Sequence, residues 1–325
     1  MKMPWGRRRA IQACIAVVFL LLVVQYVDLR GVLSALCKIS LPDIGVLVAL
    51  SLVLICLSVA KWRLFLRQLR IEASFLHLTR LYVVGYFFNI FTPSFIGGDV
   101  VRSLYVGPSV DRAHAVSATF LERYTGIIAM LFISLVAVLV SDIATPQIRL
   151  TVIALSVSCL VGTWVLYSGV ISRLSKRLGL SSRITSLSCR IHDGLVWGAQ
   201  DRALVLRALL LSMVFHLFTV INTAAVGRAV GWEYIPWQGL MVVVPLILLV
   251  GAIPVSPQGL GIQEGAFLYF LHAVGATTDQ ALAIAVILRA KSYLLALIGG
   301  VLFIGLPRNR SQQDGVVSPE IDCRD

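Results

Sequence analysis

The organisation of this chain is decided by two short stretches in which proline and glycine interrupt apolar sequence. The first, NIFTPSFIGGDVVR, covers residues 89–102, and the second, IPVSPQGLGIQE, covers residues 253–264. Each contains a proline, a glycine four residues later and then an acidic residue, as Pro93, Gly97 and Asp99 illustrate in the first stretch. Because proline and glycine both disfavour a continuous helix, each stretch predicts a helix break within apolar surroundings.

The composition of the whole chain excludes a soluble protein. Of its 325 residues, 58% are hydrophobic and only 14% are charged, whereas a soluble domain carries about 25% charged residues. So few charges cannot cover a globular surface. The sequence therefore predicts an all-α polytopic integral membrane protein.

Uncharged stretches predict where the chain crosses the membrane. A helix needs about 20 residues to span about 30 Å of hydrocarbon, and most of the stretches qualify. We expect about seven full spans and two broken segments. The uncharged stretches are 11–27, 44–60, 81–98, 124–141, 150–172, 208–227, 234–263, 265–278 and 292–307.

Lysine and arginine residues orient the chain, because cytoplasmic loops carry an excess of them. They gather before residue 10, at 61–70, at 173–202 and after residue 307. Placing these segments in the cytoplasm puts both termini there. The expected organisation is a basic cytoplasmic N-terminus (1–10), one transmembrane domain (11–306, with halves of about 11–140 and 150–306) and a polar cytoplasmic tail (307–325).

This orientation requires two segments that return to the face from which they enter. Segment 76–113 must enter from the cytoplasm, and segment 234–278 must enter from outside. Broken segments that enter from opposite faces are the sequence sign of an inverted repeat with its site between the breaks. Two ordinary kinked helices, or loops outside the membrane, remain the alternative interpretation.

Three motifs in order resemble those of a known membrane family. They are FFNIFTPSFIGGDVVRSLYV (87–106), SATFLERYTGIIAM (117–130) and IPVSPQGLGIQEGAFLYFL (253–271). With their flanks they cover about residues 11–305. They resemble the flippase-like family named after the transmembrane region of lysylphosphatidylglycerol synthase.

The resemblance implies a translocase that moves a lipid between the leaflets of the cell (inner) membrane. The lipid would be anionic, aminoacylated, or of the glycosylated or polyprenyl kind. Aminoacyl-lipid synthases carry a large soluble transferase domain after this region, and here a polar tail is expected instead. Lysyl transfer is therefore not expected of this chain, and a separate transferase becomes a candidate partner. Gln263 stands where many relatives have a basic residue, which puts a local ion pair there in doubt.

Asp99 and Arg102 are the first candidate site residues. They lie three residues apart, on one helical face just after Gly97 and Gly98. Arg102 suits a lipid phosphate, because a guanidinium donates two parallel hydrogen bonds. The alternative is an Asp99–Arg102 pair that only holds the hairpin closed. The glycines favour the first interpretation, since they admit another backbone or a headgroup.

Glu122 and Arg123 are adjacent in the sequence, one turn into an apolar helix. Neighbouring residues point to different helix faces, so they cannot pair well with each other. A charge at membrane depth costs at least about 2.5–3.5 kcal/mol, so each needs a partner. We expect Glu122 to meet Arg102, and Arg123 to meet Asp99. A purely structural clamp is as consistent with this pattern as contact with substrate.

The second break carries its own candidate set. Glu264 begins the short apolar stretch 265–278, where it complements the helix dipole. Gly259 and Gly261 are expected to leave backbone N–H groups free for an anion. Arg289 lies too far from either end of the last span to reach water, and Glu264 is its expected partner.

Together these residues form the expected headgroup-binding set. His216 is expected to be a hydrogen-bonded packing residue, and Lys61 and Arg63 to be interfacial anchors. No sequence motif indicates a cofactor, a metal or a nucleic acid, and the net charge of +12 is explained by topology. The expected substrate-binding residues are Asn89, Gly97, Gly98, Asp99, Arg102, Glu122, Arg123, Gly259, Gly261, Glu264 and Arg289.

Two other function classes stay open at this point. One is an integral-membrane transferase that uses Glu122 or Asp99 as a base on a lipid-linked substrate. The other is a scaffold that recruits a partner enzyme through the basic loop 173–203. The few intramembrane acids are matched by arginines, which favours binding and moving an anion over proton transfer. The headgroup, the direction and energy source of transport, and the oligomeric state are not encoded in these patterns.

Overall fold

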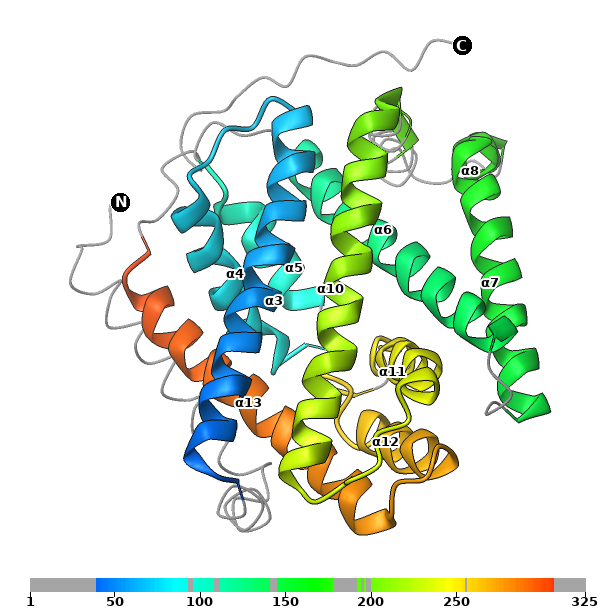
Figure 1. The fold of residues 1–325 in the computed structure, drawn as a ribbon. Coiled ribbons are helices and arrows are strands. Elements are labelled where there is room, and N and C mark those ends of the chain that lie inside the picture. The colour runs from blue at the N-terminus through cyan, green and yellow to red at the C-terminus, as the bar shows by residue number, and fades with distance from the viewer. Residues whose placement is uncertain are drawn as a thin grey trace.

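The described part of the chain is built of helices, without a strand (Figure 1). The computed structural model describes residues 39–92, 96–107, 112–140, 145–177, 192–193, 196, 200–254 and 256–306. This confirms the expected all-helical class. The helices are α3 (Leu41–Gln68), α4 (Phe75–Asn89), α5 (Ile96–Tyr105), α6 (Arg112–Val140), α7 (Pro146–Tyr167), α8 (Val170–Arg177), α10 (Arg202–Ala229), α11 (Trp237–Gly251), α12 (Ile262–Ala273) and α13 (Thr278–Ile304).

Five helices in the described residues are long and apolar enough to cross a membrane, namely α3, α6, α7, α10 and α13. The predicted first span at 11–27 lies outside the described residues, as do the basic N-terminus (1–10) and the tail (307–325). The total of about seven spans therefore stays a prediction. The last of the five, α13, begins at Thr278, so that Arg289 and Lys291 lie near its middle.

Polar residues fix where several helices begin. Ser40, Ser74, Thr145 and Thr277 each accept a hydrogen bond from the backbone N–H three residues later, and Asp201 accepts from Ala203 and Leu204. Such caps satisfy backbone donors that the first helical turn leaves unpaired. The long apolar helices therefore begin at positions that the local sequence specifies.

Two series of four helices follow the same order of lengths. The helices α3, α4, α5 and α6 have 28, 15, 10 and 29 residues. The helices α10, α11, α12 and α13 have 28, 15, 12 and 27 residues. In both series the two short helices flank a break, and α7 and α8 lie between the series in the chain.

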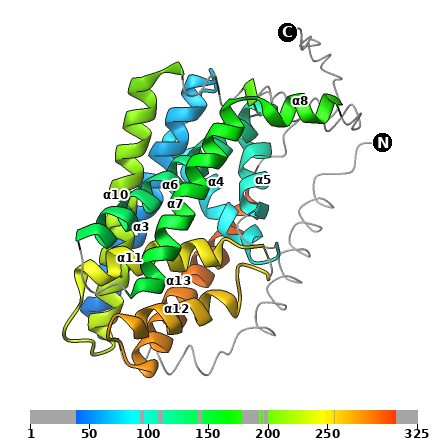
Figure 2. The ribbon, with the colours of Figure 1, turned by 90° about the vertical axis from the view of Figure 1, so that its right-hand side faces the viewer.

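The two series pack against each other, and the contact of α4 with α13 has its counterpart in the contact of α11 with α6. Helix α4 packs on α13, α11 packs on α6, and α3 packs on α10 (Figures 1 and 2). A Cβ atom at Gly299 of α13 would fall on the Val83 carbonyl oxygen of α4. Glycine is therefore what allows α4 and α13 to approach so closely.

The two breaks meet inside the molecule. The Gln258 backbone N–H donates to the Thr92 carbonyl oxygen, with 3.2 Å between the two atoms. In the second break Gln258, Gly259 and Gly261 have φ angles of 48°, 67° and 81°. This left-handed backbone prevents α11 from continuing into α12. Pro93 of the first break lies outside the described residues.

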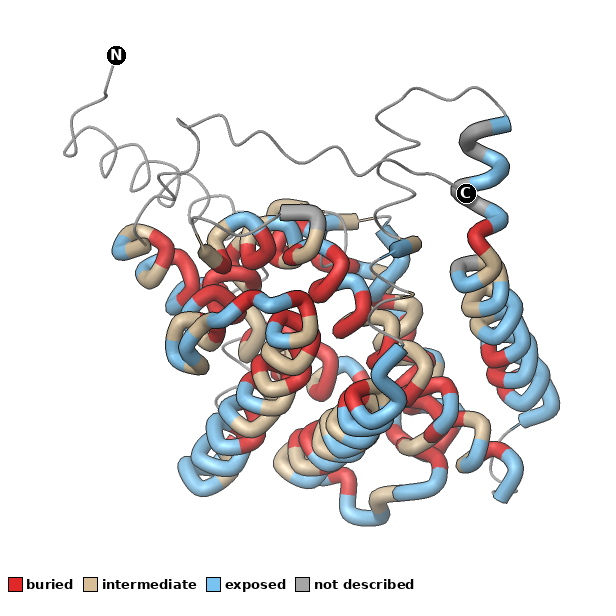
Figure 3. Tube along the Cα trace, turned by 90° about the horizontal axis from the view of Figure 1, so that it is seen from above, coloured by how far each residue is buried: buried red, intermediate tan, exposed pale blue. Residues whose placement is uncertain are grey.

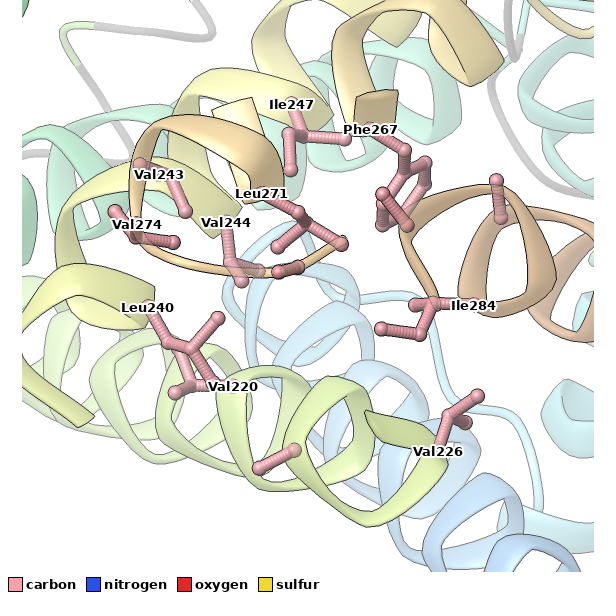
Figure 4. Close-up of a cluster of buried hydrophobic side chains, with 14 of the residues drawn as sticks. Val220, Val226, Leu240, Val243, Val244, Ile247, Phe267, Leu271, Val274 and Ile284 are labelled. Atoms are coloured by element: carbon pink, nitrogen blue, oxygen red, sulfur yellow. The ribbon is translucent and has the colours of Figure 1, made fainter. Parts of the chain in front are cut away.

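Buried residues gather on the faces that the helices turn toward one another (Figure 3). Figure 3 shows buried residues on the inner helix faces and exposed residues on the outer faces, with α7 at the edge largely exposed. Figure 4 shows the largest apolar cluster, to which α10, α11, α12 and α13 contribute Val220, Leu240, Leu271 and Ile284. Exposed apolar outer faces are what a lipid environment requires.

Candidate functional site

Five charged side chains meet between α3, α5 and α6. They are Lys61 of α3, Asp99 and Arg102 of α5, and Glu122 and Arg123 of α6, and we call them the charge cluster. Four of them are residues that the sequence predicted for the site. Lys61 is the one that sequence reasoning missed.

Glu122 lies at the centre of the charge cluster. Its Oε2 atom accepts a hydrogen bond from Arg102 Nη2 at 2.5 Å, and its Oε1 atom lies 3.5 Å from Lys61 Nζ. The side chain is only 3% exposed. The expected Glu122–Arg102 pair is confirmed, and Lys61 supplies a second cation.

Asp99 joins the remaining two arginines. Arg123 donates to both of its oxygens, from Nε to Oδ2 at 3.0 Å and to Oδ1 at 3.3 Å, and from Nη2 to Oδ1 at 2.9 Å. Arg102 Nη2 lies 2.9 Å from the same Oδ1 atom. Both the expected Asp99–Arg123 pair and the i, i+3 contact between Asp99 and Arg102 are confirmed.

The cluster has one more positive than negative charge, and it opens at one end. Three cations face two carboxylates. The side chains of Lys61, Arg102 and Glu122 are 6%, 2% and 3% exposed, whereas those of Asp99 and Arg123 are 23% and 39% exposed. Arg123 is therefore the member of the cluster that is most accessible from outside.

Arg102 is enclosed by aromatic rings. Its guanidinium carbon lies 4.9 Å from the ring centre of Trp62 and 4.8 Å from that of Tyr82. Trp62 is itself fixed by donating from Nε1 to Thr119 Oγ1 at 3.1 Å. The Nε and Nη1 atoms of Arg102 have no hydrogen-bond partner within the described residues. Cation–π contact thus stabilises an arginine whose donors are only partly used.

The expectation that Lys61 is an interfacial anchor is wrong. The residue is buried and paired with Glu122, and only the neighbouring Arg63 retains partial exposure. The burial arises because α10 and α6 cover this side of α3. The expectation for His216 is confirmed, since its Nε2 atom lies 3.0 Å from the Gly126 carbonyl oxygen.

Asn89, Gly97 and Gly98 serve the first break itself. The Gly98 N–H donates to Asn89 Oδ1 at 2.8 Å, and the Gly97 N–H donates to Thr92 Oγ1 at 2.9 Å. A Cβ atom at Gly98 would collide with the Gly85 carbonyl oxygen of α4. Of the two possibilities, a backbone or a headgroup, it is therefore another backbone that these glycines admit.

The second break holds a separate ion pair. Arg289 Nε donates to Glu264 Oε1 at 2.6 Å, which confirms the expected partner. Arg289 also donates to the carbonyl oxygen of Gln258 at 2.8 Å and to that of Gly259 at 3.4 Å. Its Nη2 lies 3.4 Å from Gln263 Oε1. One cation and one carboxylate make this pair neutral, and the arginine is well supplied with acceptors.

The expectation of free amides at Gly259 and Gly261 is wrong. The Gly261 N–H donates to Glu264 Oε2 at 2.7 Å, and the Gly259 N–H donates to the Ser256 carbonyl oxygen at 3.0 Å. The cause is local, because Glu264 lies three residues after Gly261 and reaches back to cap the start of α12. Carbonyl oxygens, rather than amides, face Arg289.

Comparison with known proteins extends over both breaks and the charge cluster. A family model described as "Lysylphosphatidylglycerol synthase TM region" matches residues 9–300. A UPF0104 membrane protein from Methanothermobacter thermautotrophicus is 23% identical over 330 residues, which cover 91% of this chain and 93% of that protein. No solved structure shows a significant match. The chain is a membrane protein and belongs to the lysylphosphatidylglycerol synthase TM region family.

Proposed function

We propose that the protein is a lipid translocase that moves a lipid with a phosphate-bearing headgroup between the leaflets of the cell (inner) membrane. The observation that carries the proposal is the charge cluster, in which the described residues bring three cations and two carboxylates together and leave one arginine partly exposed. Membership of the family supports a membrane-embedded role for the cluster. Anionic, aminoacylated and polyprenyl-phosphate lipids share the phosphate that such a site would bind.

Arg123 is the residue that we assign to the headgroup. It is the most exposed member of the cluster, and its guanidinium can donate to phosphate oxygens as it does to Asp99. Arg102 is too enclosed to reach a ligand, so its role is to position Glu122 and Asp99.

An inverted repeat is part of the proposal. Two observations support it: the helix lengths follow the same order in both series, and the packing of α4 on α13 matches that of α11 on α6. The ion pairs correspond as well, because Asp99–Arg123 and Glu264–Arg289 are separated by 24 and 25 residues. In this arrangement α4–α5 and α11–α12 are re-entrant hairpins from opposite faces, and their breaks meet near the midplane.

The charge cluster and the Glu264–Arg289 pair differ in charge and exposure, and we assign them different roles for this reason. The charge cluster is positively charged and open at Arg123, whereas the Glu264–Arg289 pair is neutral and Arg289 is nearly buried. We therefore assign binding to the cluster and assign Glu264–Arg289 to holding the second break closed. Breaking the second pair would affect the stability of the α11–α12 hairpin before it affected headgroup affinity.

A transferase has less support from the geometry. Its bases would be Glu122 or Asp99, and both carboxylates are engaged by cations. A carboxylate held by two cations is a poor proton acceptor, because protonation would leave those cations unpaired. The scaffold hypothesis rests on the loop 173–203, most of which lies outside the described residues.

Leaflet exchange in liposomes tests the proposal. Purified protein would be reconstituted with a labelled phosphatidylglycerol, and exchange would be compared for wild type, Arg123→Ala, Arg123→Lys and the control Arg228→Lys. Hydrogen bonds to charged groups contribute about 1.5–3 kcal/mol, so Arg123→Ala should slow exchange by about tenfold or more. Headgroup turnover without leaflet exchange would instead establish the transferase. Equal exchange by wild type and Arg123→Ala would refute the assignment of Arg123.

A further inference from the structure

A second lysine within an apolar helix, Lys291, belongs neither to the charge cluster nor to the Glu264–Arg289 pair. Lys291 is near the middle of α13, and its Nζ donates to Asn222 Oδ1 of α10 at 2.6 Å. It lies two residues after Arg289, which faces the second break instead. Within the described residues, Lys291 forms no salt bridge.

The corresponding place in the first series carries a complete ion pair. Lys61 and Asn222 stand equally far from the first residues of α3 and α10, which are both 28 residues long. In the first series the lysine on the α3 side faces Glu122 of α6. In the second series the lysine is on α13, and the residue facing it is an amide. The second series thus has an amide at the position that matches Lys61, and its own lysine lies on the facing helix without a carboxylate partner among the described residues.

The amide of Asn222 cannot neutralise Lys291. Its oxygen accepts a hydrogen bond, but it carries no charge to cancel the ammonium. A lysine at membrane depth costs several kcal/mol unless it is paired or hydrated. Asn222 is buried, and its neighbours Val220 and Ala224 belong to the apolar cluster of Figure 4. The ammonium therefore borders an apolar region in which an anion would be strongly attracted.

The flanks of this pair face outward. Ile221, beside Asn222, and Leu294, three residues after Lys291, are both exposed. Lys291 itself is only partly buried. An apolar outer surface beside a half-buried cation suits a lipid, whose acyl chains cover the surface while its phosphate reaches the cation.

We propose that Lys291 and Asn222 form a second phosphate-binding site, separate from the charge cluster. Lys291 supplies the charge and the two N–H donors that its bond to Asn222 Oδ1 leaves, and the Asn222 NH₂ group supplies further donors for the phosphate oxygens. The ligand class is an anionic phosphate, either that of a lipid or free phosphate. The inference extends the proposed function, since it gives the second series a binding site of its own, but it stands on different residues.

The number of bound lipids tests this site separately from the cluster. Native mass spectrometry of detergent-solubilised protein with dihexanoyl phosphatidylglycerol should find two bound lipids for wild type. Lys291→Gln should retain one, Arg123→Ala should retain one, and the double variant should retain none. Unchanged binding by Lys291→Gln would overturn the second site, whereas unchanged binding by Arg123→Ala alone would overturn the proposed function. Inorganic phosphate, added as competitor, identifies free phosphate as the ligand if it displaces the Lys291-dependent lipid.

Asn222→Asp is the sharper variant, because it leaves Lys291 in place. The new carboxylate would recreate the ion pair of the first series and compete with the ligand. We expect a melting temperature no lower than that of wild type and affinity at the second site weaker by about tenfold or more. Lys291→Arg, which keeps the charge, should retain the site. Full affinity in a folded Asn222→Asp variant would refute the proposal.

Discussion

Glu122 decides the stability of the charge cluster, because it is the carboxylate that two buried cations share. Arg102 and Lys61 both face it, and all three side chains are nearly inaccessible to solvent. Removing its charge would leave three cations with only Asp99. Removing Arg102 instead would leave two cations and two carboxylates. The two substitutions are therefore not equivalent, although each breaks the same ion pair.

Glu122→Gln should lower the stability of the protein strongly, and the effect should be reversed by a second substitution. Leaving buried charges unpaired costs about 3–5 kcal/mol. The double variant Arg102→Met/Glu122→Gln restores the original net charge of the cluster and should recover most of the loss. Melting temperatures in detergent measure the effect, with the exposed Glu233→Gln as control. A double variant less stable than Glu122→Gln would contradict this account.

A double substitution of Asp99 and Arg102 tests whether Arg102 binds the lipid headgroup or only forms an ion pair with Asp99. The variant Asp99→Asn/Arg102→Met keeps the net charge of the cluster and leaves Arg123 in place. We expect it to fold and to retain lipid exchange in liposomes, because Arg102 is enclosed by Trp62 and Tyr82. A stable variant without exchange would return headgroup binding to Arg102, which is the interpretation that the sequence alone favoured.

The sequence predicted these pairings because helix geometry constrains them. Adjacent Glu122 and Arg123 point to different faces, so each had to find a separate partner across the fold. Lys61 was missed because it precedes the basic end of a span and resembles an interfacial anchor. Its burial depends on how α10 crosses α3, which no local pattern reveals. The capping of Gly261 by Glu264 was open to prediction from their spacing alone.

At the scale of the helices, Gly299 controls how closely α13 approaches α4. Gly299→Ala should destabilise the protein by about 1–3 kcal/mol, because the new Cβ would fall on the Val83 carbonyl oxygen. Gly265→Ala in α12 is the matched control, since nothing lies within 4 Å of the Cβ position there. It should be neutral or stabilising by about 0.5–1 kcal/mol. Equal melting temperatures for the two variants would show that the helices can separate freely.

The existence of most described helices was predictable, but their partners were not. Uncharged stretches and the Pro–Gly breaks located α4, α5, α11 and α12, and Arg289 marked the interior of α13. The packing of α4 on α13 joins segments that are remote in sequence. Gly299 and Gly300 were its local signal, and they are equally compatible with other small-residue contacts in membranes.

The distribution of arginine predicts how the whole molecule is oriented in the membrane. In Figure 1 the end of α3, the helix α8 and the start of α10 lie at the top. Arg67, Arg173 and Arg202 belong to these regions. The start of α7 and the end of α10 lie at the bottom. From the positive-inside rule we expect the upper end to face the cytoplasm.

Cysteine accessibility tests that direction. Single cysteines at positions 30, 149, 183 and 230, introduced into a cysteine-free background, would be labelled with a membrane-impermeant maleimide in intact cells. We expect labelling at 30, 149 and 230 and protection at 183. Labelling of position 183 from outside would invert the orientation and exchange the faces from which the two hairpins enter.

The length of the short helices has an electrical consequence for any charged cargo. At 1.5 Å per residue, α5 and α12 extend about 15–18 Å, roughly half the thickness of a bilayer core. In the proposed arrangement, a headgroup carried past the contact between Thr92 and Gln258 would cross from one half of the membrane's electric field to the other. One elementary charge that crosses the full field changes in energy by about 2.3 kcal/mol per 100 mV. An inside-negative voltage would then drive a singly charged anionic lipid outward, and a potassium diffusion potential across the liposome should set the direction of net flow.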